Sequence, residues 1–240
     1  MACGLIVVAI SACKKPTALL SSNVSNADAA TMLAGSLSAN SYGLTNISTD
    51  IGMHVNTAMS SNQACGSTVI DTVTRRSVPG ADVSYSYKLT YSRKLTCNTS
   101  SQPDNVSSNL AYSGFFSNSA LSITNSGTAV FTVAGLTTNA TAYVLNGEYK
   151  SSGSFKLKPD TAANNGSASV DIVVKNINVS KATQVINSGT ATVIVTGTTV
   201  KKGDFTYNGT LTFNGNFMAT LTLNGSNYTI NLATGTVAKK

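Results

Sequence analysis

The sequence has few charged side chains, no tryptophan and one histidine, His54, and each scarcity narrows what the protein can be. Charged residues make up 10% of the 240 residues, against about a quarter in an average globular protein. Serine, threonine and asparagine must therefore supply most of the polar surface, a composition common among exported β-rich proteins. No helix-turn-helix, zinc-finger or RNP-like pattern occurs, so we expect no nucleic-acid partner.

The net charge of +7 comes from 16 basic and 9 acidic residues. The basic residues are scattered and form pairs at most, which favours a mildly cationic surface without a dedicated partner. The alternative is attraction to an anionic surface such as lipopolysaccharide or an acidic glycan.

Groups that could carry out catalysis are sparse. The acidic residues are dispersed, and no serine nucleophile elbow, P-loop, glycine-rich dinucleotide turn or calcium loop appears. We therefore expect no enzyme activity, no cofactor and no metal site, with His54 in a structural role. An unrecognised active site would need two or three acidic residues to meet near His54.

Residues 1–13 read MACGLIVVAISAC and contain a short apolar run. The run is too short to span a membrane, which takes about 20 apolar residues, and it is typical of a secretory signal. Its end, ISAC at residues 10–13, resembles the bacterial lipoprotein box. The resemblance implies cleavage after Ala12 and acylation of Cys13, which would attach the protein to a lipid bilayer. The alternative is a buried N-terminal strand.

We accordingly divide the chain into a signal peptide (1–12), a flexible tether (13–26) and a single β-rich domain (27–240). The tether starts with Lys14-Lys15-Pro16, which is similar to lipoproteins of the Bacteroidota. The lipoprotein resemblance as a whole implies a place in the cell envelope, on the outer membrane, facing the periplasm or the surface.

Residues 27–60 are the only stretch with helical character. Asn26 or Asp28 could cap a first helix. A second helix is indicated by apolar residues at every fourth position, and Gly35 and Gly43 are expected to separate the two helices. The apolar positions are Ile47, Ile51, Val55 and Met59.

Cys65 and Cys97 form an even pair once Cys13 is acylated and Cys3 is lost with the signal. In an exported protein such a pair predicts a disulfide. A bridge closing a loop of this length contributes roughly 3–4 kcal/mol in the chain-entropy model. Two free thiols in a reducing compartment are the alternative.

Strands are expected at 68–76 and 83–95, joined around Pro79-Gly80. Tyr85, Tyr87 and Tyr91 share one face of the second strand, where they could form a ligand platform, although such rows mostly pack in the core. The polar stretch 98–109, which carries a proline, is expected to be a loop.

An internal repeat follows. ITNSGTAVFTVAG at 123–135 matches VINSGTATVIVTG at 185–197, which defines copies of about 62 residues at 114–175 and 176–237. Two copies favour a duplicated meander over a solenoid. We expect the Asn-Ser-Gly stretches to be turns in which Gly127 and Gly189 supply positive φ. Residues 156–166 are expected to be a loop.

The C-terminal stretch 204–237 alternates apolar and polar residues, which predicts antiparallel strands. Asn214-Gly215 and Asn224-Gly225 are expected to form tight hairpins. Odd-numbered positions of 204–213 and 217–223 should point inward.

Together these patterns predict a mainly β fold, with N-terminal helices over one face of a large antiparallel sheet that is curved or half-barrel in shape; the alternative is a two-sheet sandwich. In architecture alone it is similar to the half-barrels of lipoprotein carriers. We expect a membrane-anchored envelope lipoprotein with a non-catalytic binding or interaction role. An apolar or glycan ligand would need an open groove under the helices, whereas a purely structural protein would have a filled core and a flat polar outer face.

Overall fold

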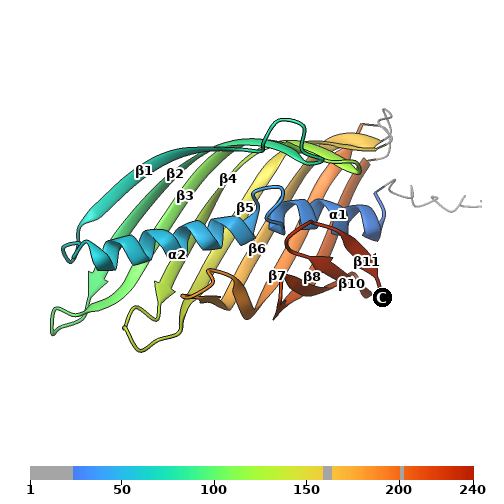
Figure 1. Ribbon diagram of the computed structural model, residues 1–240. Helices are drawn as coiled ribbons and strands as arrows, with labels where there is room; N and C mark the ends of the chain where they lie inside the picture. The colour runs from blue at the N-terminus through green and yellow to red at the C-terminus, as the bar shows by residue number, and fades with distance from the viewer. Residues whose placement is uncertain (1–23, 159–163, 201–202) are drawn as a thin grey trace, which may run out of the picture.

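The computed structural model describes residues 24–158, 164–200 and 203–240, which form two helices and one antiparallel sheet (Figure 1). Eleven strands follow one another in sequence order across the sheet, and each strand pairs with its neighbours in the chain. The sheet is curved and open, so the predicted mainly β fold with helices on one face is confirmed over the sandwich. Cys13 and most of the expected tether lie outside the described residues.

The elements are α1 (Asn26–Leu37), α2 (Leu44–Ser60), β1 (Thr68–Arg76), β2 (Ser84–Cys97), β3 (Pro103–Ser117), β4 (Leu121–Ala134), β5 (Ala142–Leu157), β6 (Asn165–Ser180), β7 (Ile186–Thr199), β8 (Gly203–Gly215), β9 (Met218–Leu223), β10 (Ser226–Asn231) and β11 (Val237–Lys239).

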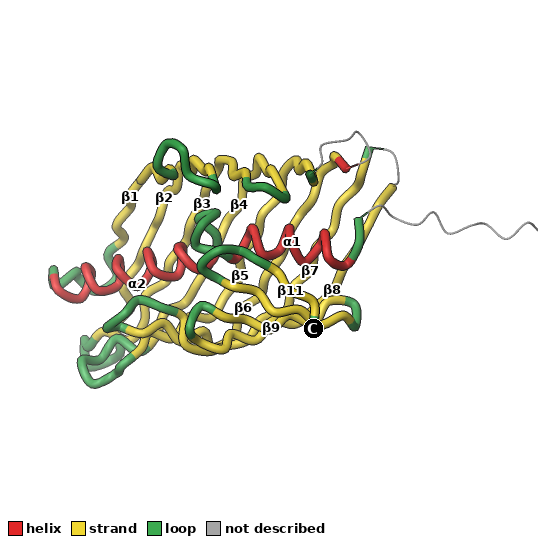
Figure 2. Tube along the Cα trace, turned by 45° about the vertical axis from the view of Figure 1, so that its right-hand side comes forward, coloured by secondary structure: helices red, strands yellow, loops and turns green. Residues whose placement is uncertain are grey.

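Both helices lie against one side of the curved sheet, which we call the inner face; the opposite side is the outer face (Figures 1 and 2). Period-two alternation places the large apolar side chains of the strands on the inner face. Tyr91, Phe116, Phe131 and Phe155 are among the largest fully buried side chains there. Burial of one such side chain stabilises the fold by roughly 1.5–3 kcal/mol. The hydrophobic core therefore fills the space between helices and sheet.

The N-cap of helix α1 lies one residue before the first predicted cap, Asn26. Ser25 is the N-cap: its Oγ accepts from the Asp28 N–H, and the Asp28 carboxylate accepts from the Ser25 N–H. This reciprocal capping box satisfies two helix-end donors, so Asn26 and Asp28 were wrong as caps. Gly35 lies inside α1, where a Cβ atom would come within 2.3 Å of the Phe116 ring. Gly43, by contrast, is the N-cap of α2.

Residues 98–109 are not a loop throughout, because β3 starts at Pro103. Proline is tolerated at the first position of a strand, where no ladder hydrogen bond from its nitrogen is needed. The following alternation buries Val106 and Leu110 on the inner face. Ser107 and Asn109 face outward and Ser108 is a buried polar residue on the inner face, and this polar content made the stretch look like a loop.

Both Asn-Ser-Gly stretches are likewise strand and not turn. Gly127 lies within β4 and does not have positive φ, whereas Gly189, in β7, has φ 135° as predicted. A Cβ atom on Gly127 would lie 2.0 Å from the Lys150 carbonyl oxygen and 2.5 Å from the Tyr112 hydroxyl. Glycine is required there by close packing of a tyrosine and a neighbouring strand.

One of the two predicted C-terminal hairpins has the expected turn. Asn224 and Gly225 have φ 43° and 79° and connect β9 to β10, as a two-residue hairpin turn requires. Between β8 and β9, however, the turn residues are Asn216 and Phe217, after an irregularity in pairing at Gly215. Phe217 is therefore 37% exposed and does not point inward. The other large apolar odd positions are buried as predicted: Phe205, Leu211, Phe213, Leu221 and Leu223.

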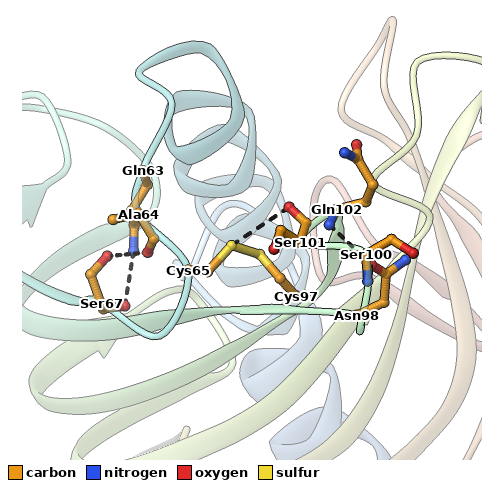
Figure 3. Close-up of a disulfide and its surroundings, with 9 residues drawn as sticks. All are labelled: Gln63, Ala64, Cys65, Ser67, Cys97, Asn98, Ser100, Ser101 and Gln102. Carbon is orange, nitrogen blue, oxygen red and sulfur yellow. Dashed lines mark hydrogen bonds between the residues drawn. A yellow bond between two sulfur atoms is a disulfide. The ribbon is translucent and has the colours of Figure 1, made fainter.

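A disulfide joins Cys65, in the connection between α2 and β1, to Cys97 at the end of β2 (Figure 3). Beyond it, the Asn98 side-chain oxygen accepts from the Ser100 and Gln102 N–H groups, both at 3.0 Å, and holds the β2–β3 turn (Figure 3). The strands 68–76 and 84–97 follow the prediction closely. Among the described helices, none is long and apolar enough to cross a membrane.

Candidate functional site

A cluster of charged side chains lies on the inner face where α2 meets β1 and β2. Its centre is Asp50 on α2, which is 3% exposed. The Asp50 carboxylate accepts hydrogen bonds from the hydroxyls of Tyr42 (2.6 Å) and Tyr91 (2.8 Å) and from Arg75 Nη2 (3.3 Å). A buried carboxylate needs such partners to remain ionised. These bonds attach α2 to the edge of the sheet.

His54 lies one helical turn after Asp50, with its ring edge-on to Tyr91 at a centroid distance of 4.7 Å. Burial lowers the pKa of His54, the charge of Arg93 lowers it further, and Asp50 and Asp71 both act to raise it. Two acidic residues therefore lie near the histidine, which is the condition that an unrecognised active site would need.

The bonding of this cluster favours a structural role. Asp50 already has three donors, and Asp71 forms an ion pair with Arg93. Burial, followed by the nearby Asp50 carboxylate, raises the pKa of Tyr42 and Tyr91, so both hydroxyls stay protonated donors. Nδ1 of His54 is buried without a hydrogen-bond partner in the described chain. Within the described ranges, no three His, Cys, Asp or Glu residues are grouped to hold a metal ion.

A layer of tyrosines occupies the inner face closer to α1. Tyr112 and Tyr149 stack with ring centroids 5.6 Å apart. The Tyr87 hydroxyl donates to Asn125 Oδ1 at 3.0 Å, and Asn125 Nδ2 donates to Ser151 Oγ at 2.7 Å. Burial raises the pKa of Tyr149 to about 12. These rings and their polar partners are buried in the core and do not form an open ligand platform.

The outer face carries a groove of about 630 Å³ across β4 to β7. Lys150 projects into it, because its neighbours in β5, Tyr149 and Ser151, are buried on the inner face. Lys150 Nζ lies 2.7 Å from Glu148 Oε2 and 3.8 Å from Asp171 Oδ2. Burial and the neighbouring Glu148 raise the pKa of Asp171, and its Oδ1 finds no donor in the part of the chain described.

The surroundings of the groove are hydroxyl-rich with exposed apolar residues. The strand register places five hydroxyl side chains opposite one another across neighbouring strands β3 to β7. Three large apolar side chains nearby, on β4, β6 and β7, are 42–52% exposed. Such a mixture of apolar contact area and short polar groups is suited to binding a partner. The hydroxyl row is Ser113, Ser126, Ser152, Ser169 and Thr196, and the apolar residues are Val130, Val173 and Ile194.

A second cleft, of about 860 Å³, opens at one end of the strands beside α1 and is lined mainly by polar residues such as Asn40, Asp82 and Asn118. It is not the continuous apolar groove under the helices that a lipid carrier would need, since the inner face there is occupied by core side chains. The ligand expected in the concavity of the sheet therefore has no observed site among the described residues.

Sequence reasoning located Cys65, Cys97 and His54 but missed the two charged groups. The Glu148-x-Lys150 spacing on a strand could have indicated an outward pair, since residues two apart share a face. Nothing in the sequence connected Asp50 with Arg75. No family model matches the chain, and neither curated proteins nor solved structures give a match.

Proposed function

We propose that this protein is a bacterial envelope lipoprotein, anchored in a membrane through acylated Cys13, that has a non-catalytic binding or interaction role. The observation that carries the binding role is the contrast between the two faces of the sheet. Core residues occupy the inner face, whereas the outer face is left uncovered by either helix and holds the groove around Lys150 (Figure 2).

The chemistry of the outer face indicates what it binds. Short hydroxyl side chains lose little conformational entropy on contact, and Lys150, Glu148 and Asp171 provide fixed charges of both signs. Val173 and Ile194 add exposed apolar area. A polar envelope component, such as a glycan or the surface of another envelope protein, fits this mixture better than a lipid tail does.

The anchor is tested by metabolic labelling with a fatty acid in cells that make the full chain. Cys13→Ala is expected to lose the label and membrane attachment, and Cys3→Ala, a cysteine ten positions earlier, is the matched control that keeps both. A labelled Cys13→Ala protein would contradict the anchor.

The binding face is tested by a photo-cross-linking amino acid in living cells, placed at Ser152 or Val173 on the outer face and at Thr138, in the exposed β4–β5 connection, as the control. Adducts specific to the two outer-face positions, and lost with Lys150→Ala, are expected. Equal adducts from all three positions, or none, would refute the binding role and favour a purely structural envelope protein, which the filled inner face also permits.

A further inference from the structure

Strand β1 forms one end of the sheet, and it is a long edge strand that has no partner on one side within the described ranges. It has nine residues and pairs only with β2 among the described strands (Figure 1). A free edge of this length exposes a row of backbone donors and acceptors, which proteins usually cover or pair. Two large apolar residues on or beside this edge, Ile70 and Val78, are 67% and 73% exposed.

The hydrogen-bonding pattern between β1 and β2 shows which backbone groups of β1 point away from β2, toward the free edge. The Ser77 N–H donates to the Tyr85 carbonyl at 3.0 Å, and the pairing of β1 with β2 continues from there without a bulge. Residues alternate in the direction of their backbone groups along an antiparallel strand. The odd-numbered residues of β1 therefore bond to β2, and Thr72 and Thr74 direct their N–H and C=O groups to the free edge.

The sequence of β1 is complementary to itself. When two copies are placed antiparallel about a two-fold axis at Val73, each residue lies opposite the one at the mirrored position. Asp71 then lies opposite Arg75 of the second copy, on the inner face, and Thr72 lies opposite Thr74. Opposite charges and threonine pairs are favourable cross-strand neighbours. On the outer face, Ile70 is a diagonal neighbour of Val78 in the second copy.

Asp71 and Arg75 both keep the capacity to make this second contact. Asp71 binds Arg93 through Oδ2, and its side chain is 41% exposed. Arg75 uses Nε for Tyr42 and Nη2 for Asp50, and its side chain is 38% exposed. Moving the two-fold axis by one residue, to Thr72, would place Asp71 opposite Val73 and remove both ion pairs, so charge selects the register.

We propose that two copies of this protein pair through β1 about an axis at Val73, which joins their sheets into one continuous antiparallel sheet. This inference is independent of the proposed envelope role, because it concerns only the sheet edge. The occupant is a second copy and not another protein, because the mirrored charges and threonines are properties of this strand alone.

The test is a disulfide trap in whole extracts of cells that make the full chain, read on a non-reducing gel after mild oxidation. Val73 is a non-hydrogen-bonded position on the axis, where opposing Cα atoms are about 4.5 Å apart, within the range for a disulfide. Val73→Cys is expected to run as a dimer of doubled mass. Arg76→Cys is the matched control, because its two copies would be about 20 Å apart along the strands.

A second pair of variants tests the backbone bonds. In the Val73→Cys background, Thr72→Pro removes an outward N–H and leaves the backbone bonds to β2 in place, and loss of the cross-link is expected. The hydrogen bond between the Thr72 and Thr90 hydroxyls is lost equally in Thr72→Ala. Thr72→Ala keeps that N–H and should keep the cross-link. Resistance to limited proteolysis equal to that of the unsubstituted chain reports that each variant is folded.

The proposal is overturned if Val73→Cys forms no more dimer than Arg76→Cys does. It is also overturned if the Val73→Cys chain still cross-links when it carries Thr72→Pro. A Val73→Cys adduct with a different protein would also overturn it. The unsubstituted full chain in detergent provides a further check by light scattering: a protein mass of two chains is expected, and a monomer contradicts the inference.

Discussion

At the scale of single residues, Asp50 determines how the second helix is held. Its carboxylate is the shared acceptor for two tyrosine hydroxyls and an arginine, all from different segments of the chain. Each bond alone is worth about 1 kcal/mol net, but leaving buried donors without an acceptor costs their full desolvation. The cluster thus makes the position of α2 depend on one side chain.

Asp50→Ala is expected to lower the free energy of unfolding by about 2–3 kcal/mol, because the Tyr42 and Tyr91 hydroxyls lose their hydrogen-bond acceptor. Arg75 also loses its ion-pair partner, but this costs less because its side chain is partly exposed to water. The urea midpoint measures this. Asp82→Ala, at an exposed position, should change stability by less than about 0.5 kcal/mol. Equal effects of the two substitutions would show that the Asp50 contacts contribute nothing.

His54 should make stability depend on pH. Its pKa in the folded protein is lowered by burial, below the value of about 6.5 in an unfolded chain. The unfolded state therefore takes up a proton first as the pH falls, and stability decreases from neutral pH down to the folded pKa, below which this contribution levels off. Denaturation midpoints from pH 8 to 5 should fall more steeply for the native chain than for His54→Asn. Parallel profiles would show that the pKa of His54 is the same in both states.

At the scale of elements, the sequence predicted much of what depends on alternation or local turn chemistry, although the turn expected at Asn214-Gly215 is formed by Asn216 and Phe217. The strands at 68–76 and 84–97, the Asn224-Gly225 turn and the buried Phe213 and Leu221 follow from such patterns. The errors at 98–109 and Gly127 came from polar or glycine residues whose position is decided by another strand. The partners of Asp50 and Lys150 were missed for the same reason, since long-range contacts leave no mark on local spacing.

The assignment of strand faces is tested on β8 and β9. Leu221→Asp places a carboxylate at a fully buried inner-face position, and a cost of about 4 kcal/mol or more is expected, a large part of the 5–15 kcal/mol of a typical domain. Thr212→Asp, at an exposed outer-face position of the paired strand, should leave the protein folded. Circular dichroism and thermal melting measure both, and a normal melting temperature for Leu221→Asp would show that the faces are assigned wrongly.

At the scale of the whole molecule, the two ends of the sheet are secured by different means. At the β11 end, the connection between β10 and β11 is contacted by the N-terminal helix region: the Ala39 N–H donates to the Leu232 carbonyl at 2.7 Å and the Asn40 N–H donates to the Ala233 carbonyl at 3.0 Å. The β1 end is tied by the Cys65–Cys97 bridge. A covalent link there limits how far the free edge strand can separate from β2.

Replacing both bridge cysteines by serine is expected to lower the free energy of unfolding by about 3 kcal/mol, since the unfolded chain regains the entropy of an open loop. Denaturant titration of the double variant measures this loss. The native chain with reductant is the matched comparison and should show a similar decrease. No change in either would mean that the bridge does not form in the protein as made.

The order of the strands also has a kinetic consequence. Each hairpin can form from residues close together in the chain, and local contacts of this kind favour fast folding. The contacts of α1 with the far end of the sheet instead join residues about 200 positions apart, such as Asn26 and Ser226. The first helix can therefore pack against the sheet only after the last strands have formed. In a chain that emerges gradually from a ribosome or an export channel, the inner face of the sheet would stay exposed until synthesis or export is complete.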